Sequence, residues 1–208
     1  MSNPVELTVT MKIDVDGAPN AYCPHDKDAD GNAALDLELN AHVGGKPEGR
    51  IVGYLTRNND GRTGIPQSKD DPFPTCFISI TAFQDRKNAN ELDPRKYVDA
   101  SKINYVVGGD FAQQHGVHPG NFVAVHSKKH DKSVYGIVGD SGNRSGAEGS
   151  LALLQNLGYP FKNGISGSSD HMDIVIRYFP GSNPNKQFFF TQADLDAAAT
   201  SEGLSKTF

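Results

Sequence analysis

The sequence predicts a mainly β fold, and three observations support this class. Several runs of residues alternate between apolar and polar types, which is the two-residue period of a half-buried strand. Glycine and proline are frequent, with 22 and 12 residues, as expected for a chain with many turns. Only two short stretches have the spacing and end signals of helices. We therefore expect a sheet or barrel with a few short peripheral helices.

Seven runs of the chain have the composition of strands. The first alternates threonine with valine, lysine with isoleucine, and ends at an Asp-Gly turn signal. The others are short, rich in β-branched or aromatic residues, and bounded by glycine, proline or charged residues. The seven predicted strands cover residues 6–17, 50–55, 75–83, 102–107, 121–127, 133–139 and 171–179.

Two helices are predicted, and each has a start signal. The first covers residues 147–157. Ser145 stands three residues before Glu148, which is the spacing of a capping box. The second covers residues 192–200 and begins after Thr191, a side chain that caps helices well. In this interpretation Glu148 is only a capping residue.

Composition and charge exclude several classes of function. The formal net charge is −5, so the chain has no basic footprint for nucleic acid. It has no apolar run long enough to span a membrane, and its first residues lack the pattern of a secretory signal. A chain of 208 residues is of the size of one domain. We expect a soluble monomer of one domain, residues 1–208, with no nucleic-acid or membrane partner.

The two cysteines leave two possibilities open. Cys23 and Cys76 are too few for a disulfide scaffold and are not spaced as metal ligands. They are either two free thiols or a single disulfide. We favour free thiols.

Two stretches have a partial resemblance to metal sites. Residues 26–32, "DKDADGN", begin like a calcium-binding loop, but Leu37 stands where the twelfth position needs a bidentate glutamate. His126 and His130 are four residues apart, yet their surroundings predict a hairpin and not a helix. We therefore expect neither a metal nor another cofactor.

The stretch at 136–158, "GIVGDSGNRSGAEGSLALLQNLG", carries two carboxylates in a glycine-rich loop. Cleavage of a glycosidic bond uses such a pair, one to protonate the leaving oxygen and one to activate water or attack the sugar. Asp140 follows an apolar run, where burial would keep it protonated, and Glu148 opens a predicted helix, where the charged form is favoured. The loop is thus either architectural or catalytic. In the catalytic interpretation these environments suit Asp140 as acid and Glu148 as base, but the sequence leaves the division of roles open.

Four stretches in order resemble glycoside hydrolase family 75, the endo-chitosanases. They are "MKIDVDGAPNAY", "DASKINYVVGG", "YGIVGDSGNRSGAEGSLALL" and "SSDHMDIVIRYFPGS", which together run from about residue 11 to residue 182. The chain departs from the family pattern at three places: Ala147 replaces a frequent glycine, Asn104 replaces proline, and Asp170-His171 reverses a His-Asp pair. The reversed pair lies in a loop that we expect to line the substrate groove.

The resemblance implies a six-stranded double-psi-type β-barrel with one catalytic domain. It implies an inverting enzyme that cleaves β-1,4 bonds inside chitosan, with Asp140 and Glu148 as the catalytic pair. The residues that we expect to bind the polysaccharide lie in the matching stretches: Asp14, Asp16, Tyr22, Asp99, Tyr105, Asn143, Asp170 and His171.

Two other functions remain open. The chain could cleave the glycan strands of peptidoglycan as a bacterial cell-wall-targeting effector, or it could bind glycans on the same fold without cleaving them. Known chitosanases of this kind are exported, so we expect an extracellular or exported protein, although no signal peptide is visible in the sequence.

Overall fold

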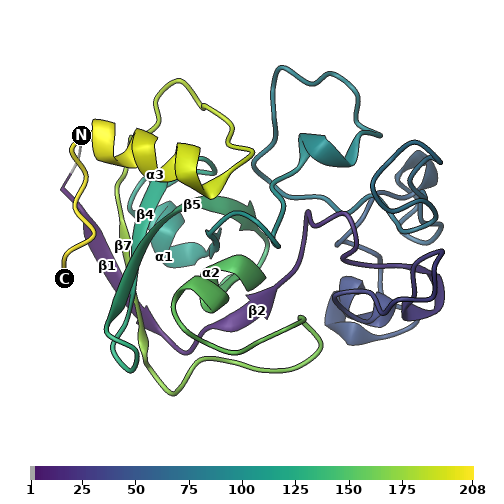
Figure 1. Ribbon diagram of the computed structural model, residues 1–208, viewed down its shortest axis with the longest axis horizontal. Helices are drawn as coiled ribbons and strands as arrows, with labels where there is room; N and C mark the ends of the chain where they lie inside the picture. The colour runs from purple at the N-terminus through teal and green to yellow at the C-terminus, as the bar shows by residue number, and fades with distance from the viewer. Residues whose placement is uncertain (1–2) are drawn as a thin grey trace.

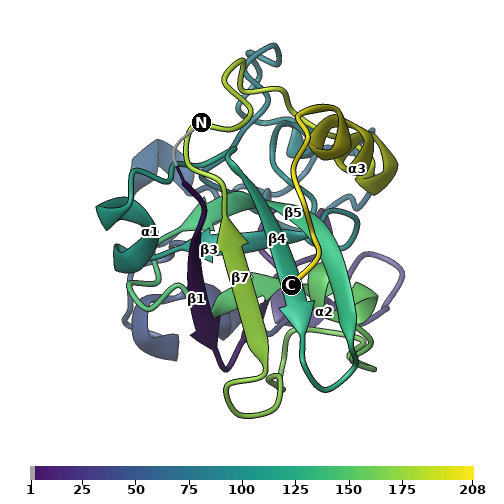
Figure 2. The same cartoon turned by 90° about the vertical axis from the view of Figure 1, so that its left-hand side faces the viewer.

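The computed structural model describes residues 3–208. Within them, seven strands form one curled, mixed sheet in the order β1-β7-β4-β5-β3-β6-β2, seen edge-on in Figure 1 and from the face of its first strands in Figure 2. The strands are β1 (Val5–Val9), β2 (Lys12–Asp14), β3 (Tyr105–Gly108), β4 (Phe122–Ser127), β5 (Lys132–Ser141), β6 (Glu148–Ser150) and β7 (Ile174–Tyr178). The mainly β prediction is confirmed, whereas the six-stranded double-psi barrel is not.

The described residues also form three α-helices and five short 3-10 helices. They are α1 (Asp110–Gln114), α2 (Leu151–Asn156), α3 (Gln192–Ser201), η1 (Pro24–Asp26), η2 (Glu38–Ala41), η3 (Val43–Gly45), η4 (Arg57–Asn59) and η5 (Pro94–Lys96). The predicted start of the last α-helix is confirmed, because the Thr191 side chain accepts a hydrogen bond from the Asp194 amide.

The helix predicted at 147–157 begins later than its sequence signal indicates. Glu148 lies in strand β6, which pairs with β2 on one side and β3 on the other. The cap of α2 is Ser150, whose Oγ accepts a hydrogen bond of 3.1 Å from the amide of Leu153. The capping role of Ser145 and Glu148 is therefore wrong, because pairing with two neighbouring strands holds residues 148–150 in an extended conformation.

The first predicted strand is divided in two. Its N-terminal half, β1, pairs with β7, and its C-terminal half, β2, pairs with β6 in parallel. Met11, between the halves, donates its backbone amide to Ser169 Oγ at 2.9 Å. The chain thus changes pairing partner at this point, which no alternation of residue types could reveal.

Two apolar clusters pack on opposite sides of the sheet, because successive side chains of a strand point to opposite faces. Cluster A contains Tyr105, Val107 and Ile137 from the strands, and it extends to Val15 and Tyr22. Cluster B contains the alternate strand residues and the buried side of α2; its members include Met11, Val106, Val138, Leu153 and Ile176. This alternation becomes important at the end of β5.

Residues 15–104 contain no strand within the described part of the chain and lie beside the sheet, on the right of Figure 1. The strands predicted at 50–55 and 75–83 are present only as isolated bridges, such as Tyr54 with Ser79 and Pro66 with Phe77. Gly53 interrupts the first of these runs, and neither run forms a continuous ladder of backbone hydrogen bonds. This irregular segment forms one wall of the site described below.

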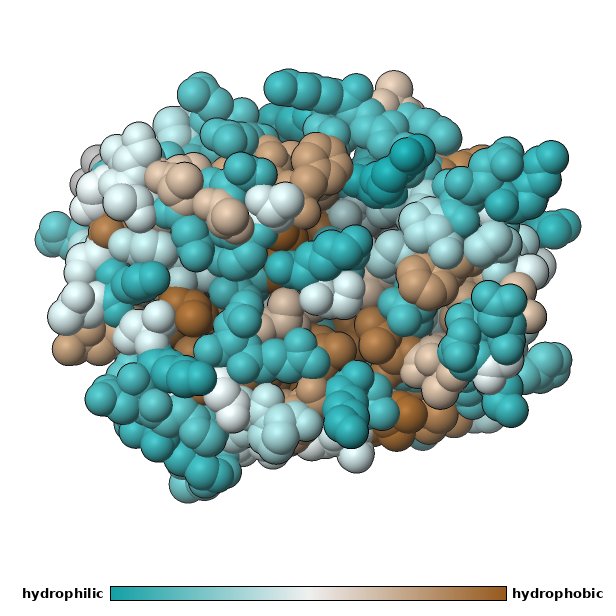
Figure 3. All heavy atoms as spheres, viewed as in Figure 1, coloured by the Kyte–Doolittle hydropathy of each residue, from teal (hydrophilic) through white to brown (hydrophobic). Residues whose placement is uncertain are grey.

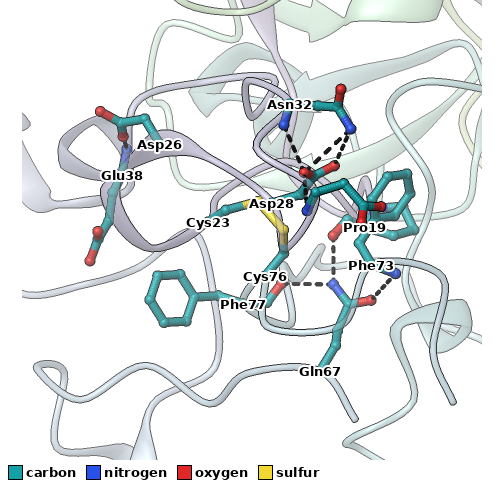
Figure 4. The surroundings of a disulfide bond; sticks show 11 residues. Pro19, Cys23, Asp26, Asp28, Asn32, Glu38, Gln67, Phe73, Cys76 and Phe77 are labelled. Atoms are coloured by element: carbon teal, nitrogen blue, oxygen red, sulfur yellow. Dashed lines mark hydrogen bonds between the residues drawn. A yellow bond between two sulfur atoms is a disulfide. The ribbon is translucent and has the colours of Figure 1, made fainter. Parts of the chain in front are cut away.

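A disulfide bond joins Cys23 to Cys76 inside this irregular segment, as Figure 4 shows. Both cysteines are fully buried. The prediction of free thiols is therefore wrong, because the two residues, 53 positions apart in the sequence, meet only in the folded chain. The bond fastens a segment that has few regular hydrogen bonds of its own.

Candidate active site

A cavity of about 1070 Å³ lies between the sheet and the irregular segment. Its floor comes from the ends of β2, β5 and β6, and its other walls come from residues 36–52, 80–84 and 164–167. On the face of the molecule shown in Figure 3, apolar and hydrophilic side chains are interspersed. Aspartate, glutamate, histidine and lysine residues are among those that line the cavity.

A β-bulge directs Asp140 into this cavity. Val106 pairs with Val138, whereas the next residue, Val107, pairs with Asp140, so Gly139 is an extra residue on β5. In a regular strand Asp140 would point to the same face as Val138, toward cluster B. The bulge reverses this, and Asp140 shares the side of Val107 and cluster A.

Glu148 enters the cavity from β6, the short strand between β2 and β3. Its register partner on β2 is Lys12. The next residue, Gly149, packs so closely that a methyl group there would lie 2.6 Å from Met11 Sδ. Glycine therefore allows β6 to fit between its two neighbours and to carry Glu148 to the floor of the cavity.

Asp14, Asp16 and Asp140 form a compact group of carboxylates. One oxygen from each lies within 4.8 Å of the others. The Tyr22 hydroxyl donates to Asp16 Oδ1 at 2.8 Å, and the Asp16 amide donates to Asp14 Oδ1 at 2.9 Å. Asp140 Oδ1 accepts a hydrogen bond of 2.8 Å from the amide of Ala82, in the irregular segment.

Burial and mutual repulsion make these carboxylates hard to ionise. Burial, followed by the charge of Asp14, raises the pKa of Asp140 to about 8. Burial, followed by the charge of Glu148, raises the pKa of Asp14 to about 6 against the opposing hydrogen bond from the Asp16 amide. Burial and the charge of Asp14 also raise the pKa of Asp16 well above its usual range. At neutral pH the group therefore retains a proton.

Comparison with known protein families gives one match. Residues 11–203 match the family described as fungal chitosanases of glycosyl hydrolase group 75. The chain belongs to this family. It is therefore a glycoside hydrolase of the chitosanase type, and a polysaccharide is the class of substrate that the family implies. A search of curated protein sequences finds no match.

The cavity of this family 75 hydrolase contains most of the residues that the sequence indicated. Asp14, Asp16, Tyr22 and Asn143 line it together with Asp140 and Glu148. Tyr105 does not line it but lies fully buried beneath it, where its hydroxyl donates to the backbone oxygen of Asp16 at 2.9 Å.

Three of the indicated residues lie outside the lining of the cavity. Asp99 forms an ion pair of 2.8 Å with Lys102. Asp170 forms an ion pair of 3.0 Å with Lys129, and His171 Nδ1 lies 3.5 Å from Thr10 Oγ1. In this structure these three side chains contact neighbours on the surface.

Several lining residues were not indicated by the sequence. The irregular segment contributes Asp36, Asn40 and His42, and other parts of the chain contribute Lys12 and Gln84. Residues 36–45 form turns and 3-10 helices without a recognisable motif, so only their position in space marks them. For Lys12 the signal was its place inside the matching stretch "MKIDVDGAPNAY", which begins at Met11.

The three aspartates of the group form the one cluster of potential metal ligands found among residues 3–208, so a cation could bind there.

In the calcium-like loop at 26–32, the carboxylate of Asp28 bonds to the backbone of the loop itself. Asp28 Oδ1 accepts hydrogen bonds from the amides of Asp30 and Asn32 at 2.9 and 2.8 Å, as Figure 4 shows in part for Asn32. Those bonds close a turn of the loop on itself.

Proposed function

We propose that this family 75 hydrolase cleaves β-1,4 bonds inside chitosan chains with inversion at the anomeric carbon. Asp140 is the general acid and Glu148 is the general base. The observation that carries the proposal is that two carboxylates from different strands line one cavity, and the environment of one of them favours its protonated form at neutral pH.

The chemistry divides between the two carboxyl groups. Asp140 transfers its proton to the glycosidic oxygen as the bond from that oxygen to the anomeric carbon breaks. Glu148 takes a proton from a water molecule, whose oxygen attacks the anomeric carbon from the opposite side of the sugar ring. Burial and the charge of Asp14 support the role of Asp140, because they oppose its ionisation before the proton is needed.

The charge of the cavity favours a cationic polymer. Five carboxylates line it, against a single residue of the lysine and arginine class, and they are Asp14, Asp16, Asp36, Asp140 and Glu148. Such a cavity attracts the ammonium groups of chitosan and repels the phosphates of nucleic acid. Peptidoglycan, the second candidate, carries carboxylates of its own, so the same field opposes it.

The proposal includes a setting outside the cell, with the chain acting as one catalytic domain and as a monomer. The buried disulfide between Cys23 and Cys76 supports export, because such bonds persist in oxidising compartments. Among residues 3–208 there is no helix both long and apolar enough to cross a membrane.

The test is incubation of the protein with chitosan, chitin and purified peptidoglycan, followed by mass spectrometry of the soluble products. We expect internal cleavage of chitosan, with products of several lengths from the earliest times. Proton NMR of the first products should show the α-anomer at the new reducing end. Release of peptidoglycan fragments alone would select the second candidate, and the absence of products from all three would leave glycan binding.

A further inference from the structure

Asp36 is the one carboxylate of the cavity that is outside the proposed reaction and outside the compact group of aspartates. It stands just before η2, and it is buried, with an exposed fraction of 7%. Charged residues are seldom buried to this extent unless they are paired. Its position in the cavity lining therefore calls for a binding partner or a structural role.

The structural role accounts for only one of its two oxygens. Asp36 Oδ1 accepts hydrogen bonds of 2.7 Å from the Leu37 amide and of 2.7 Å from Asn40 Nδ2. These bonds hold the turn that leads into η2. Within residues 3–208, no hydrogen bond or ion pair reaches Oδ2, and this atom is not sealed from the cavity.

Glycine at position 164 keeps side-chain atoms away from Oδ2. Gly164 lies opposite, and a methyl group at that position would come within 3.2 Å of Oδ2. The same methyl group would lie 2.7 Å from Val15 Cγ1, so the fold requires glycine at this point. Lys12, the lysine of the cavity lining, forms no ion pair in the described part of the chain. No ion pair within the described residues therefore neutralises the charge at Oδ2.

A carboxylate with one fixed and one free oxygen is suited to a cationic donor. An ammonium group has three N–H donors and a full positive charge, whereas an acetamide group has one N–H and no charge. Asp36 also lies near enough to Asp14 for its charge to contribute to raising the pKa of that residue. The free oxygen therefore belongs to the same substrate-binding space as the proposed catalytic group.

We propose that Asp36 binds the ammonium group of a glucosamine unit and so selects a deacetylated sugar at one position of the cavity. The inference rests on the proposed function for the choice of polymer, but not for the binding contact itself. Asp36 is in this view a specificity-determining residue that does not take part in bond cleavage.

The test compares binding of two intact oligomers, the hexamer of glucosamine and the hexamer of N-acetylglucosamine, by isothermal titration calorimetry. Both titrations use the Glu148→Gln background, and mass spectrometry checks that the oligomers remain whole. Asp36→Asn is the informative variant, because the amide can still accept at Oδ1 and loses only the charge at the free position. Asp70→Asn is the matched control, since Asp70 is exposed, lies outside the cavity lining and changes the net charge equally.

We expect Asp36→Asn to weaken binding of the glucosamine hexamer about ten- to a hundredfold, the value of a hydrogen bond to a charged group. Binding of the acetylated hexamer should be unchanged, and Asp70→Asn should affect neither. An equal loss for both oligomers, or no loss for either, would overturn the proposal.

A second measurement does not depend on the folding of a variant. The parent protein is given partly acetylated chitosan, and the sugars at the ends of its products are identified by mass spectrometry. Exclusion of N-acetylglucosamine from one position next to the cleaved bond supports the inference, and its acceptance at every position overturns it. If chitosan is not cleaved at all but the binding preference still depends on Asp36, the proposed function fails and the binding site remains.

Discussion

A carboxylate oxygen of Asp14 lies within 4.8 Å of one of Asp140, although strands β3 and β6 separate β2 from β5 in the sheet. Three steps between strands of a flat sheet would place the two backbones about 14 Å apart. The curl of the sheet and the bulge before Asp140 together bring the side chains toward each other. Two like charges at this distance oppose each other's ionisation, so this approach adds to the effect of burial in raising the pKa of Asp140.

The pH dependence of activity should show this coupling. If Asp140 must be protonated to act, the rate should fall as the pH rises through about 8, the value to which burial and then Asp14 raise its pKa. Asp14→Asn removes one of the causes and should move this alkaline limb to lower pH. The measurement is kcat/KM on short glucosamine oligomers across the pH range. An alkaline limb that does not move in the variant would contradict the assignment of the acid.

Stability should also depend on pH through Asp140. Its folded pKa of about 8 exceeds its ordinary value of 3.8, so between these limits the folded state holds a proton that the unfolded state releases. The contribution is complete below about pH 4 and is lost as the pH rises to about 8. Melting temperature should therefore decrease over this window, and less steeply in Asp140→Asn. An identical slope in the variant would show that Asp140 does not retain its proton in the fold.

Variants of Glu148 and Ser150 should distinguish a catalytic role from a structural one. Glu148→Gln should lower the rate at least about a hundredfold with no loss of stability, because an amide cannot exchange the proton and Glu148 caps no helix. Ser150→Ala should lower the free energy of unfolding by about 2 to 4 kcal/mol. Ser150 Oγ accepts hydrogen bonds from the Leu153 and Tyr105 amides and donates one to the Ile103 oxygen. Kinetics and urea unfolding of both variants provide the comparison. Full activity in Glu148→Gln would refute the catalytic role.

The disulfide should stabilise the irregular wall of the cavity. Replacing both Cys23 and Cys76 by alanine should lower the free energy of unfolding by about 4 kcal/mol, the loop-closure value for 53 residues. Urea unfolding of parent and variant, each with and without a reducing agent, gives the measurement. The variant itself serves as the control, because reductant should not change it. Equal midpoints for oxidised parent and variant would show that the bond does not contribute to stability.

Chelation should have no effect. The proposed mechanism uses only carboxyl groups, and the Asp28 carboxylate already closes its own loop through the amides of Asp30 and Asn32. Treatment with EDTA should leave both the hydrolytic rate and the melting temperature unchanged. A loss of several degrees that calcium restores would show instead that either this loop or the three aspartates of the cavity bind a cation.

The sequence alone determined the class of fold and the position of the proposed catalytic pair along the chain. Alternating apolar residues predicted β4, β5 and β7, because burial of one face imposes a period of two whatever the neighbouring strand. Thr191 predicted the start of α3, because a cap accepts hydrogen bonds from amides within three residues of itself. Such a signal is local and does not depend on the rest of the fold. The ordered motifs around Asp14, Tyr105, Asp140 and Asp170 indicated the family that the comparison confirms.

Only the tertiary structure decided what depends on contacts between distant segments. Glu148 has a strong local signal for a cap, but pairing of β6 with β2 and β3 prevailed over it. The disulfide, the bulge at Gly139 and the entry of Asp36 into the cavity each require residues far apart in the sequence to meet. The same holds for the raised pKa of Asp140, because burial and a neighbouring charge are properties of the folded site and not of the residue.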